Sequence, residues 1–304
     1  MNGILPLWKP RGLTSHDCVV KIRRLLKTKK VGHTGTLDPE VEGVLPICIG
    51  QATKIVPFLT DTKKTYIAEV TLGISTETED SYGEVIEKKE VLETIDSATI
   101  LSVLKQFIGD IKQVPPMYSA VKINGKKLYE YAREGKIVER PSRVVTIHNI
   151  EPLTEIKKHD NSTQSFTFQV ECSKGTYIRT LCVDIGKIFG YPAHMSKLTR
   201  TETGSFNMED SYSFEQIENA VAEGTAEKLL APIQRGVKHL DVYYVTPTLA
   251  TNIIYGQKLP IPKNLPETDP FRVQLDEKLL AIYQLHPTEQ HLIKPVRVFE
   301  TILK

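Results

Sequence analysis

The sequence predicts an α+β protein in two parts: a domain with a mixed β-sheet and flanking helices, followed by a small all-β barrel. Its 304 residues are enough for about two domains. Alternating strand patterns and amphipathic helical patterns share the first 238 residues, whereas short strands separated by Pro-rich turns fill the rest. We therefore expect one domain over residues 1–238 and a second over residues 239–304.

Four segments of the first domain carry helix signals, each beginning at a polar residue that can cap a helix. Thr14 and Asp17 have the spacing of a capping box, as do Ser213 and Gln216. Gly190 follows the last apolar residue of the third helix and is expected to end it. The expected N-caps are Thr14, Ser97, Thr176 and Ser213.

Strands are predicted where apolar residues alternate with polar ones over a short run. The segments are 66–72, 144–150 and 166–172 in the first domain, and 241–245, 271–275, 279–285 and 292–299 in the tail. Residues 115–125 are predicted to form a strand and a turn, followed by a basic helix over residues 126–133. Beyond about residue 240 helical periodicity stops, which predicts a tail made of strands alone.

Composition excludes several classes of protein. Hydrophobic residues make up 40% of the chain and charged residues 25%, which is typical of globular proteins and not of disordered or collagenous ones. No apolar run approaches the roughly 18–20 residues that a bilayer span needs. The N-terminal segment has neither a basic region nor a small-residue cleavage site, so we expect no secretory signal.

Cysteine and histidine spacing predicts a reduced protein without a metal ion. The four cysteines, Cys18, Cys48, Cys172 and Cys182, lie far apart and include no CxxC pair. We expect them to be half-buried thiols of a cytoplasmic protein. None of the eight histidines pairs with another at ligand spacing, so no metal site is expected.

The net charge is only +2, but the charges are unevenly distributed. Residues 1–66 carry a net charge of +6, residues 67–110 of −7 and residues 111–150 of +5. Two basic segments separated by an acidic one can fold into a positive face that follows a phosphate backbone. Scattered, solvated surface charge explains the same distribution equally well.

The densest group of reactive side chains lies in the loop over residues 30–50. Gly32 and Gly35 allow unusual backbone angles there, and His33 and Asp38 place a base and a carboxylate in one loop. Pro39 fixes the chain directly after the acid. On spacing alone, a structural turn in which Asp38 caps the next segment is the simpler interpretation.

Two other segments are candidates for a functional site. At residues 173–180 a glycine at a strand end precedes a helix, which places Tyr177 and Arg179 in the first helical turn, where anions bind. A surface or helix-capping arginine is the alternative. Tyr66 lies on the apolar face of its strand, so it is either a core tyrosine or a ring that stacks on a nucleobase.

The segment over residues 110–140 mixes aromatic with basic residues. They are Tyr118, Tyr129 and Tyr131 among Lys122, Lys126, Lys127 and Arg133. This mixture is typical of RNA-binding surfaces, and a helix that simply packs its tyrosines has the same composition.

Taken together, these motifs resemble those of the bacterial tRNA pseudouridine-55 synthase (TruB) family. They are Gly32-His-Thr-Gly-Thr-Leu-Asp-Pro39 with Gly43-Val-Leu-Pro46, Lys9-Pro-Arg-Gly-Leu-Thr-Ser15, Pro116-Met-Tyr-Ser-Ala-Val-Lys122 with Gly125-Lys-Lys-Leu-Tyr-Glu-Tyr-Ala-Arg133, Ser173-Lys-Gly-Thr-Tyr-Ile-Arg179, and the segment from Ala193 and His194 to Leu198. The match spans residues 1–200 in the right order. The tail resembles the PUA-type RNA-binding barrel of the family only in position and strand pattern. Glu42 is a departure, because the family often has a small or hydroxyl residue there.

The resemblance implies an isomerase that converts uridine-55 in the T-loop of tRNA to pseudouridine without a cofactor. Asp38 would be the nucleophile, Arg179 its ion-pair partner, and Tyr66 a ring that stacks on the target base and takes part in removing its C5 proton. The substrate-binding residues would be His33, near the space that the flipped uridine leaves, Tyr177, Leu198 in the pocket wall, and Lys9, which supports the loop and the RNA. An insertion at about residues 110–140 would grip the RNA.

The chemistry of that reaction agrees with these residues. The reaction breaks the N1–C1′ bond and forms a C5–C1′ bond, with no redox change and no group taken from outside. The base must leave its stack and be held in a closed pocket, and a carboxylate paired with an arginine is ionised and able to act as a nucleophile. The expected partner is tRNA, with no membrane and no metal, and the expected oligomeric state is a monomer.

Two other functions stay open at this point. One is a non-catalytic RNA-binding or tRNA-folding module that uses the same basic face and the tail. The other is a carboxylate-dependent hydrolase, which needs a second acid near Asp38, and Glu40 is the clearest choice in the sequence.

Overall fold

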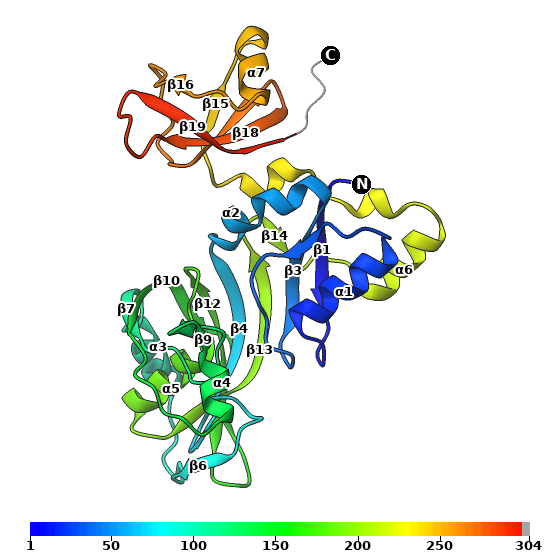
Figure 1. Ribbon diagram of the computed structural model, residues 1–304. Helices are drawn as coiled ribbons and strands as arrows, with labels where there is room; N and C mark the ends of the chain where they lie inside the picture. The colour runs from blue at the N-terminus through cyan, green and yellow to red at the C-terminus, as the bar shows by residue number, and fades with distance from the viewer. Residues whose placement is uncertain (300–304) are drawn as a thin grey trace. The chain divides into compact units, whose positions relative to one another are not determined.

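The computed structural model describes residues 1–299 and divides the chain into two compact units (Figure 1). Unit 1 consists of Met1–Glu40, Val44–Thr62 and Thr203–Lys304, and unit 2 of Val41–Gly43 and Lys63–Glu202. A domain boundary near residue 238 stays a prediction, since the residues on both sides of it belong to unit 1.

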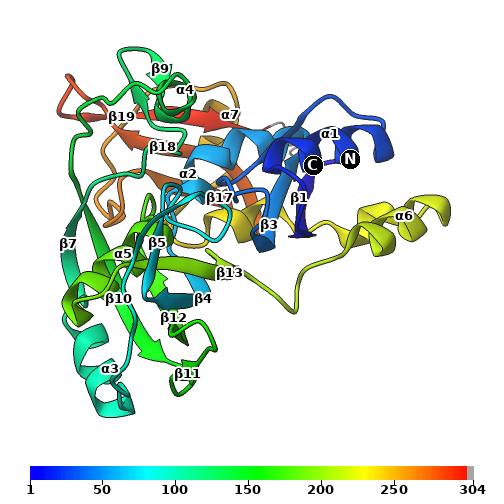
Figure 2. The same ribbon diagram turned by 90° about the horizontal axis from the view of Figure 1, so that it is seen from below.

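Unit 2 is built around a β-sheet. Its strands lie in the order β13 (Ala193–Thr203), β4 (Lys64–Leu72), β12 (Gln164–Cys172), β10 (Arg143–Pro152) and β7 (Gly109–Gln113), with β11 (Lys157–Lys158) beside β12. The β4–β12, β12–β10 and β10–β7 pairs are antiparallel. Helices α3 (Ser97–Lys105) and α5 (Ile178–Phe189) contact each other, while α3 also contacts β10 and α5 also contacts β4 (Figure 2). The three strands predicted between residues 66 and 172 are confirmed.

Two smaller pieces of unit 2 lie outside this sheet. Part of the acidic segment over residues 67–110 forms a hairpin of β5 (Ile74–Thr76) and β6 (Val85–Lys88). The predicted insertion contains β8 (Lys122–Ile123), β9 (Lys126–Lys127) and helix α4 (Leu128–Arg133). The predicted basic helix is therefore shorter than expected at its start, because its first two lysines pair in β9 and the helix begins only at Leu128.

The N-terminal part of unit 1 contains two long strands and several shorter elements. Its elements are β1 (Gly3–Lys9), α1 (Ser15–Leu25), β2 (Val31–His33), β3 (Glu42–Ile49), η1 (Gly50–Ile55) and α2 (Val56–Thr60), joined later in the chain by β14 (Phe206–Asn207), α6 (Phe214–Ala222), η2 (Ala226–Leu229) and η3 (Ile233–Val237). Strand β2 pairs antiparallel with β3, with Val31 opposite Ile49 and His33 opposite Ile47. This pairing fixes the entry to the loop that contains Asp38.

The C-terminal part of unit 1 is a five-stranded sheet. Its strands lie in the order β15 (Val242–Tyr244), β17 (Phe271–Leu275), β18 (Lys278–Leu285), β19 (Leu292–Val298) and β16 (Leu259–Pro260). The prediction of strands alone is wrong here, because α7 (Pro247–Ile254) is a helix with Thr246 as its N-cap. The helix has only eight residues, with Ala250 and Ile253 buried and Leu249 and Ile254 partly buried, so its apolar pattern covers little more than two turns.

The tail shares one apolar cluster with the N-terminal part of unit 1. Leu279, Ile282 and Phe299 of the tail belong to the same buried cluster as Ile55 and Leu59. In addition, the Lys54 Nζ donates a hydrogen bond to the carbonyl of Val298 at 2.7 Å. Removal of the tail would therefore expose apolar surface that the tail now covers.

The helix caps agree with the predictions at two helices and differ at two. Thr14 and Ser213 form the predicted capping boxes, and Gly190 ends α5 with a φ of 77°. The N-cap of α3 is Asp96, one residue before Ser97, and its carboxylate accepts from the Thr99 N–H. The N-cap of α5 is Tyr177, because the hydroxyl of Thr176 donates instead to the carbonyl of Ser173.

The four cysteines are all buried, rather than half-buried as predicted, and all are thiols. Burial raises the pKa of Cys48 to about 12 and that of Cys172 to about 11, so both stay protonated at neutral pH. Within residues 1–299, the structure has no helix that is both long and apolar enough to cross a bilayer.

Candidate active site

The loop that contains Asp38 is held in place on both sides of this residue. Before it, the Ser15 hydroxyl accepts from the Leu37 N–H at 2.9 Å and donates to the Leu37 carbonyl at 3.2 Å. After it, the Pro39 carbonyl accepts from the Gly12 N–H at 2.9 Å. The side chain of Asp38 is half-buried. The segment around Ser15 therefore fixes the backbone that presents this carboxylate.

Lys9 is buried beneath the same loop. Its Nζ donates three hydrogen bonds to backbone carbonyls, at 2.9 Å to Pro10, 2.6 Å to Leu13 and 3.0 Å to Pro39. An ammonium group has three N–H donors, so this set of carbonyls matches it in number. The contacts support the predicted role of Lys9 in holding the loop, and its contact with RNA stays a prediction.

Tyr66 lies in β4 with only 8% of its surface exposed. It is opposite Val170 in β12, and Ala68 and Val70 continue the buried face of the strand. The alternating pattern therefore predicted the face correctly. Stacking on a base and proton transfer by its hydroxyl stay predictions.

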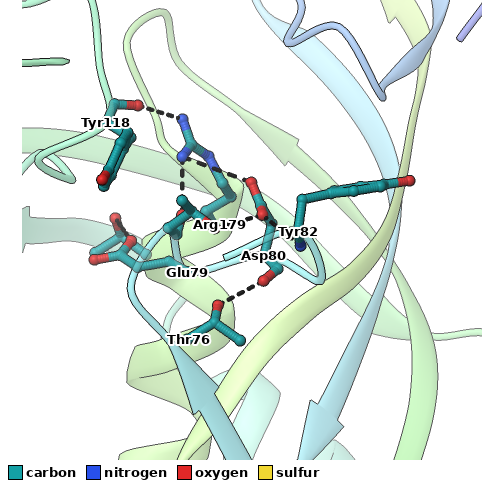
Figure 3. A network of polar contacts seen from close by, with 8 residues as sticks. Thr76, Glu79, Asp80, Tyr82, Tyr118 and Arg179 are labelled. Carbon is teal, nitrogen blue, oxygen red and sulfur yellow. Dashed lines mark hydrogen bonds and ion pairs between the residues drawn. The ribbon is translucent and has the colours of Figure 1, made fainter. Parts of the chain in front are cut away.

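Arg179 is the second residue of α5 and is 5% exposed. Figure 3 shows its guanidinium directed toward three acceptors from two other segments. Nη1 donates to the Thr78 carbonyl and Nη2 to the Tyr118 carbonyl, both at 2.9 Å, and Nη1 lies 3.8 Å from the carboxylate of Asp80. Arg179 is thus a buried and oriented cation rather than the surface residue that was the alternative.

The loop over residues 76–82 is cross-linked by its own side chains. Asp80 accepts from the Thr78 hydroxyl at 2.6 Å and from the Tyr82 N–H at 3.0 Å, and its carbonyl accepts from the Thr76 hydroxyl at 2.5 Å. In Figure 3 the Tyr82 side chain points away from Arg179. This loop therefore presents the Thr78 carbonyl to Arg179 from a fixed position.

Glu79 occupies the turn of that loop with a φ of 64°, which non-glycine residues rarely adopt. Its carboxylate accepts a hydrogen bond from the Thr180 hydroxyl at 2.7 Å. Burial raises the pKa of this carboxyl above its ordinary value, while the bond from Thr180 and the charge of Arg179 act in the opposite direction. The loop next to Arg179 thus contains an acid that responds to pH.

Tyr177 is held at the N-terminus of α5 by Gln113 of β7. The amide of Gln113 both accepts from the Tyr177 N–H at 2.8 Å and donates to the Tyr177 carbonyl at 2.9 Å. The guanidinium of Arg143 lies over the Tyr177 ring, 4.8 Å from its centroid. The half-buried ring therefore already stacks on a cation, and a contact with substrate stays a prediction.

The remaining predicted residues lie on strands. His33 ends β2 and is half-buried, and Leu198 lies in β13 with 9% of its surface exposed. On β13 as well, the ring of His194 contacts the Ile74 carbonyl at 2.8 Å. By unit, Lys9, His33 and Asp38 belong to unit 1, and Tyr66, Tyr177, Arg179 and Leu198 to unit 2.

The motif Gly43-Val-Leu-Pro46 begins at a close contact between two strands. Glu42 and Gly43 of β3 pair in parallel with Thr199 and Arg200 of β13. A Cβ at residue 43 would lie 2.2 Å from the Arg200 carbonyl oxygen, so only glycine fits without a shift of the backbone. Glu42 takes part in this pairing as a backbone position.

The aromatic and basic residues of the insertion largely pack on each other. Lys126 lies 4.8 Å from the centroid of the Tyr131 ring, and Lys127 and Arg133 lie 5.3 Å and 5.2 Å from that of Tyr129. The interpretation that the segment packs its own tyrosines is therefore correct for these two rings. The charged groups keep the segment basic, as RNA binding needs.

Several residues around the site were not singled out in the sequence. Thr78, Glu79 and Asp80 surround Arg179, Gln113 holds Tyr177, and Ser15 holds the Asp38 loop. The acidic run over residues 77–80 was visible only as charge, because its partner lies about a hundred positions later. Within residues 1–299 no group of three His, Cys, Asp or Glu side chains is arranged to hold a metal ion.

Comparison with known proteins agrees with this arrangement. The family model described as TruB family pseudouridylate synthase (N terminal domain) matches residues 23–178, and the one described as tRNA pseudouridylate synthase B C-terminal domain matches residues 179–238. A protein of Oceanobacillus iheyensis named tRNA pseudouridine synthase B is 60% identical over 300 residues, covering 98% of both chains. A protein of the same name from Bacillus subtilis is 54% identical over 302 residues, covering 98% of this chain and 97% of its own.

Solved structures show the same fold. One described as an H/ACA RNP bound to a substrate RNA containing 2′-deoxyuridine has a TM-score of 0.74 and 25% identity, covering 98% of this chain and 85% of its own. A Cbf5-Nop10-Gar1 complex has a TM-score of 0.73 and 27% identity, covering 98% and 84%. The two family models and the full-length relatives confirm the resemblance found in the motifs, and the chain belongs to the TruB family of pseudouridylate synthases.

Proposed function

We propose that this chain is a tRNA pseudouridine synthase that isomerises uridine-55 in the T-loop of tRNA to pseudouridine. Relatives with the name tRNA pseudouridine synthase B match nearly its whole length at more than half identity. The observation that carries the proposal is the Asp38 loop, because Ser15 and Lys9 hold it by three hydrogen bonds and present a half-buried carboxylate. Such a preorganised acid is what a nucleophile needs.

In this reaction the target nucleotide leaves its stack and enters a pocket. The carboxylate of Asp38 supplies the nucleophilic oxygen, which bonds to C6 of the base or to C1′ of the ribose, and the N1–C1′ bond breaks. The base then turns, C5 bonds to C1′, and the bond to Asp38 breaks again. The proton at C5 leaves while N1 gains one. Atoms and electrons balance within the nucleotide, so the residues of the chain have only to bind, orient and move a proton.

Arg179 pairs with the carboxylate of Asp38 and orients it. A guanidinium is planar and always charged, and two of its nitrogens already donate to the carbonyls of Thr78 and Tyr118. These bonds fix the plane of the group before any substrate binds. An arginine preorganised in this way stabilises negative charge without having to reorganise during the reaction.

The other predicted residues bind the nucleotide. Tyr66 stacks on the target base and takes part in removal of the C5 proton, and Leu198 lines the pocket. His33 lies near the space that the flipped uridine leaves, and Tyr177 contacts the substrate beside Arg179. Lys9 holds the Asp38 loop in place and, through this loop, supports the bound RNA.

The RNA contacts extend beyond the flipped nucleotide. The insertion at residues 110–140 grips the T-stem-loop, and residues 239–304 form a PUA-like domain that binds the rest of the tRNA. The protein acts as a monomer in the cytoplasm, where tRNA and reduced thiols occur together.

Release of tritium from tRNA labelled at C5 of uridine tests the proposal, because it reports the reaction itself. Asp38→Asn keeps the size of the side chain but lacks the anionic oxygen. We expect it to lose turnover by about a thousandfold or more while tRNA affinity stays nearly the same, since affinity comes largely from phosphate contacts.

Glu40→Gln is the matched control for Asp38→Asn, because it neutralises an exposed acid of the same loop. It should release tritium at the wild-type rate. Turnover of Asp38→Asn within tenfold of wild type would remove Asp38 from the mechanism. Tight tRNA binding by the wild-type protein without any tritium release would instead indicate the non-catalytic RNA-binding module.

A further inference from the structure

Tyr118 contacts two different members of the Arg179 network. Its backbone carbonyl accepts from Arg179 Nη2 at 2.9 Å, and its hydroxyl donates to the Glu77 carboxylate at 3.0 Å. Figure 3 shows Tyr118 beside the guanidinium, across from the loop that contains Asp80. Because Glu77 belongs to that same loop, the hydroxyl joins the insertion to it directly.

The loop over residues 76–82 is rigid without help from the insertion. Asp80 accepts from the hydroxyls of Thr76 and Thr78 as described above, and the Glu79 carbonyl accepts from the Met195 N–H of β13 at 3.0 Å. The acceptor on this side of Arg179, the Thr78 carbonyl, therefore has a fixed position.

The segment on the other side has less support of its own. Residues 114–121 form neither helix nor strand. The backbone bonds near Tyr118 lead back into the insertion, from the Tyr129 N–H to the Ser119 carbonyl at 3.1 Å and from the Leu128 N–H to the Val121 carbonyl at 2.8 Å. The Tyr118 hydroxyl thus ties an irregular segment to a rigid loop.

We propose that Tyr118, through its hydroxyl bond to Glu77, is a positioning residue for Arg179. The bond sets the distance between the two carbonyls that hold the guanidinium, one on the loop and one on the insertion. Because a guanidinium is a planar fork, movement of either acceptor turns the whole group. The inference rests on the proposed function, in which Arg179 orients the carboxylate of Asp38.

The chemistry of the bond suits this task. A phenol hydroxyl that donates to a carboxylate makes a charge-assisted hydrogen bond, which is stronger than a neutral one. The same bond raises the pKa of Tyr118 above its ordinary value, so the hydroxyl keeps its proton at neutral pH. The hydrogen bond between Tyr118 and Glu77 is therefore present at neutral pH.

The test is a double-mutant cycle on Tyr118→Phe and Glu77→Ala, measured by single-turnover tritium release. Each single variant should react about threefold to tenfold more slowly, the effect of one hydrogen bond to a charged group. Dissociation constants for tRNA should stay within about twofold of wild type, because no phosphate contact is removed. The double variant should be as slow as either single one, since all three lack the same bond.

Thr146→Val is the matched control. It also removes a hydroxyl bond to a carboxylate, that of Asp110 at 2.6 Å, but this bond joins two neighbouring strands, β10 and β7. Its rate should equal that of the wild type. All variants should unfold at nearly the wild-type temperature, which separates positioning from loss of folding.

A wild-type rate for Tyr118→Phe, or additive losses in the double variant, would overturn the proposal. A loss in tRNA affinity as large as the loss in rate would also overturn it, since Tyr118 would then contact the RNA. Arg179→Lys distinguishes this failure from failure of the proposed function. If Arg179→Lys is slow and Tyr118→Phe is not, only the positioning role fails. If both react at the wild-type rate, the proposed role of Arg179 fails as well.

Discussion

Lys9 and Arg179 are two buried cations, one in each unit, that are held by different kinds of group. Lys9 donates to three backbone carbonyls, and two of them lie within four residues of it in the sequence. Arg179 donates to two carbonyls that lie 101 and 61 residues away, and a carboxylate of Asp80 stands 3.8 Å from it. Both cations are oriented, and the guanidinium of Arg179 lies beside the carboxylate of Asp80 as well as its two carbonyls.

The difference has a physical consequence. Backbone carbonyls carry no proton that titrates, so the three bonds from Lys9 to carbonyls are the same at every pH near neutrality. The support of Arg179 includes Asp80 directly and Glu77 and Glu79 through hydrogen bonds with Tyr118 and Thr180. We therefore expect changes at Lys9 to affect stability, and changes around Arg179 to affect turnover and its dependence on pH.

The largest expected effect is that of Arg179→Lys on turnover. Lysine keeps the charge but presents a single ammonium, which cannot bond to the carbonyls of Thr78 and Tyr118 in one plane and also orient Asp38. Single-turnover tritium release should be slower by about a hundredfold to a thousandfold, the range for loss of a preorganised electrostatic group. Affinity for tRNA should be nearly unchanged.

Arg235→Lys serves as the control for this experiment. Arg235 of unit 1 also donates to a backbone carbonyl, that of Ser205 at 2.8 Å, and to a carboxylate, that of Asp210. It should react at close to the wild-type rate. A similar loss in both variants would mean that the chemistry of Arg179 is not special and that the comparison with Lys9 is wrong.

The second prediction is that Lys9→Met affects stability, in contrast to Arg179→Lys, which affects turnover. Methionine fills a similar volume but donates no hydrogen bond, so the partly buried carbonyls of Pro10 and Leu13 lose this donor, whereas Pro39 keeps the Gly12 N–H. We expect the free energy of unfolding in urea to fall by about 3 kcal/mol. The exposed Lys30→Met should stay within about 0.5 kcal/mol of wild type.

The two cations also differ in how far the sequence could predict their surroundings. The Lys9 and Asp38 segments were found as motifs, since glycine, proline and capping residues act over a few positions. The partners of Arg179 come from residues 78, 80 and 118, and no local pattern connects them to position 179. Contacts across such distances depend on the order of the strands in the sheet, which periodicity does not encode.

The same reasoning explains which parts of the fold were predicted. Alternation over several residues identified β4, β10 and β12, because one face of each strand is buried along most of its length. Helix α7 was missed because it has only eight residues, and Asp96 was missed as a cap because Ser97 beside it has an equally suitable side chain. Short elements provide too few positions for a pattern.

The third prediction concerns Gly43, where the motif after Asp38 meets β13. In Gly43→Ala the new methyl would lie 2.2 Å from the carbonyl oxygen of Arg200 and 2.7 Å from its nitrogen, so the parallel pairing has to open. We expect a loss of about 2 kcal/mol in the free energy of unfolding. Such a loss would show that backbone packing at Gly43, in addition to the hydrogen bonds of Lys9, fixes this side of the site.

Gly125→Ala is the control that separates the close contact from backbone strain. Gly125 has a positive φ of 81°, and an added Cβ there would meet nothing within 4 Å. The free energy of unfolding of Gly125→Ala should fall only by the cost of this backbone strain, about 1 kcal/mol. Equal losses in both variants would show that the contact with Arg200 contributes nothing.

The smallest expected effect is a change in pH dependence at Glu79. Burial raises the pKa of its carboxyl above the ordinary value of 4.5, so the folded protein keeps this proton to a higher pH than the unfolded chain does. As the pH rises from 4.5 through the raised value, the unfolded chain releases the proton first, and the group costs the folded state stability. Glu79→Gln still accepts the bond from Thr180 but cannot titrate, so its stability relative to wild type should increase between pH 4 and pH 7 in urea unfolding.

Thr180→Val removes the bond that opposes the rise in the pKa of Glu79. It should therefore make the fall of stability with pH steeper than in the wild type. A difference that is flat with pH for Glu79→Gln would mean that the acids around Arg179 are no more sensitive to pH than the carbonyls around Lys9.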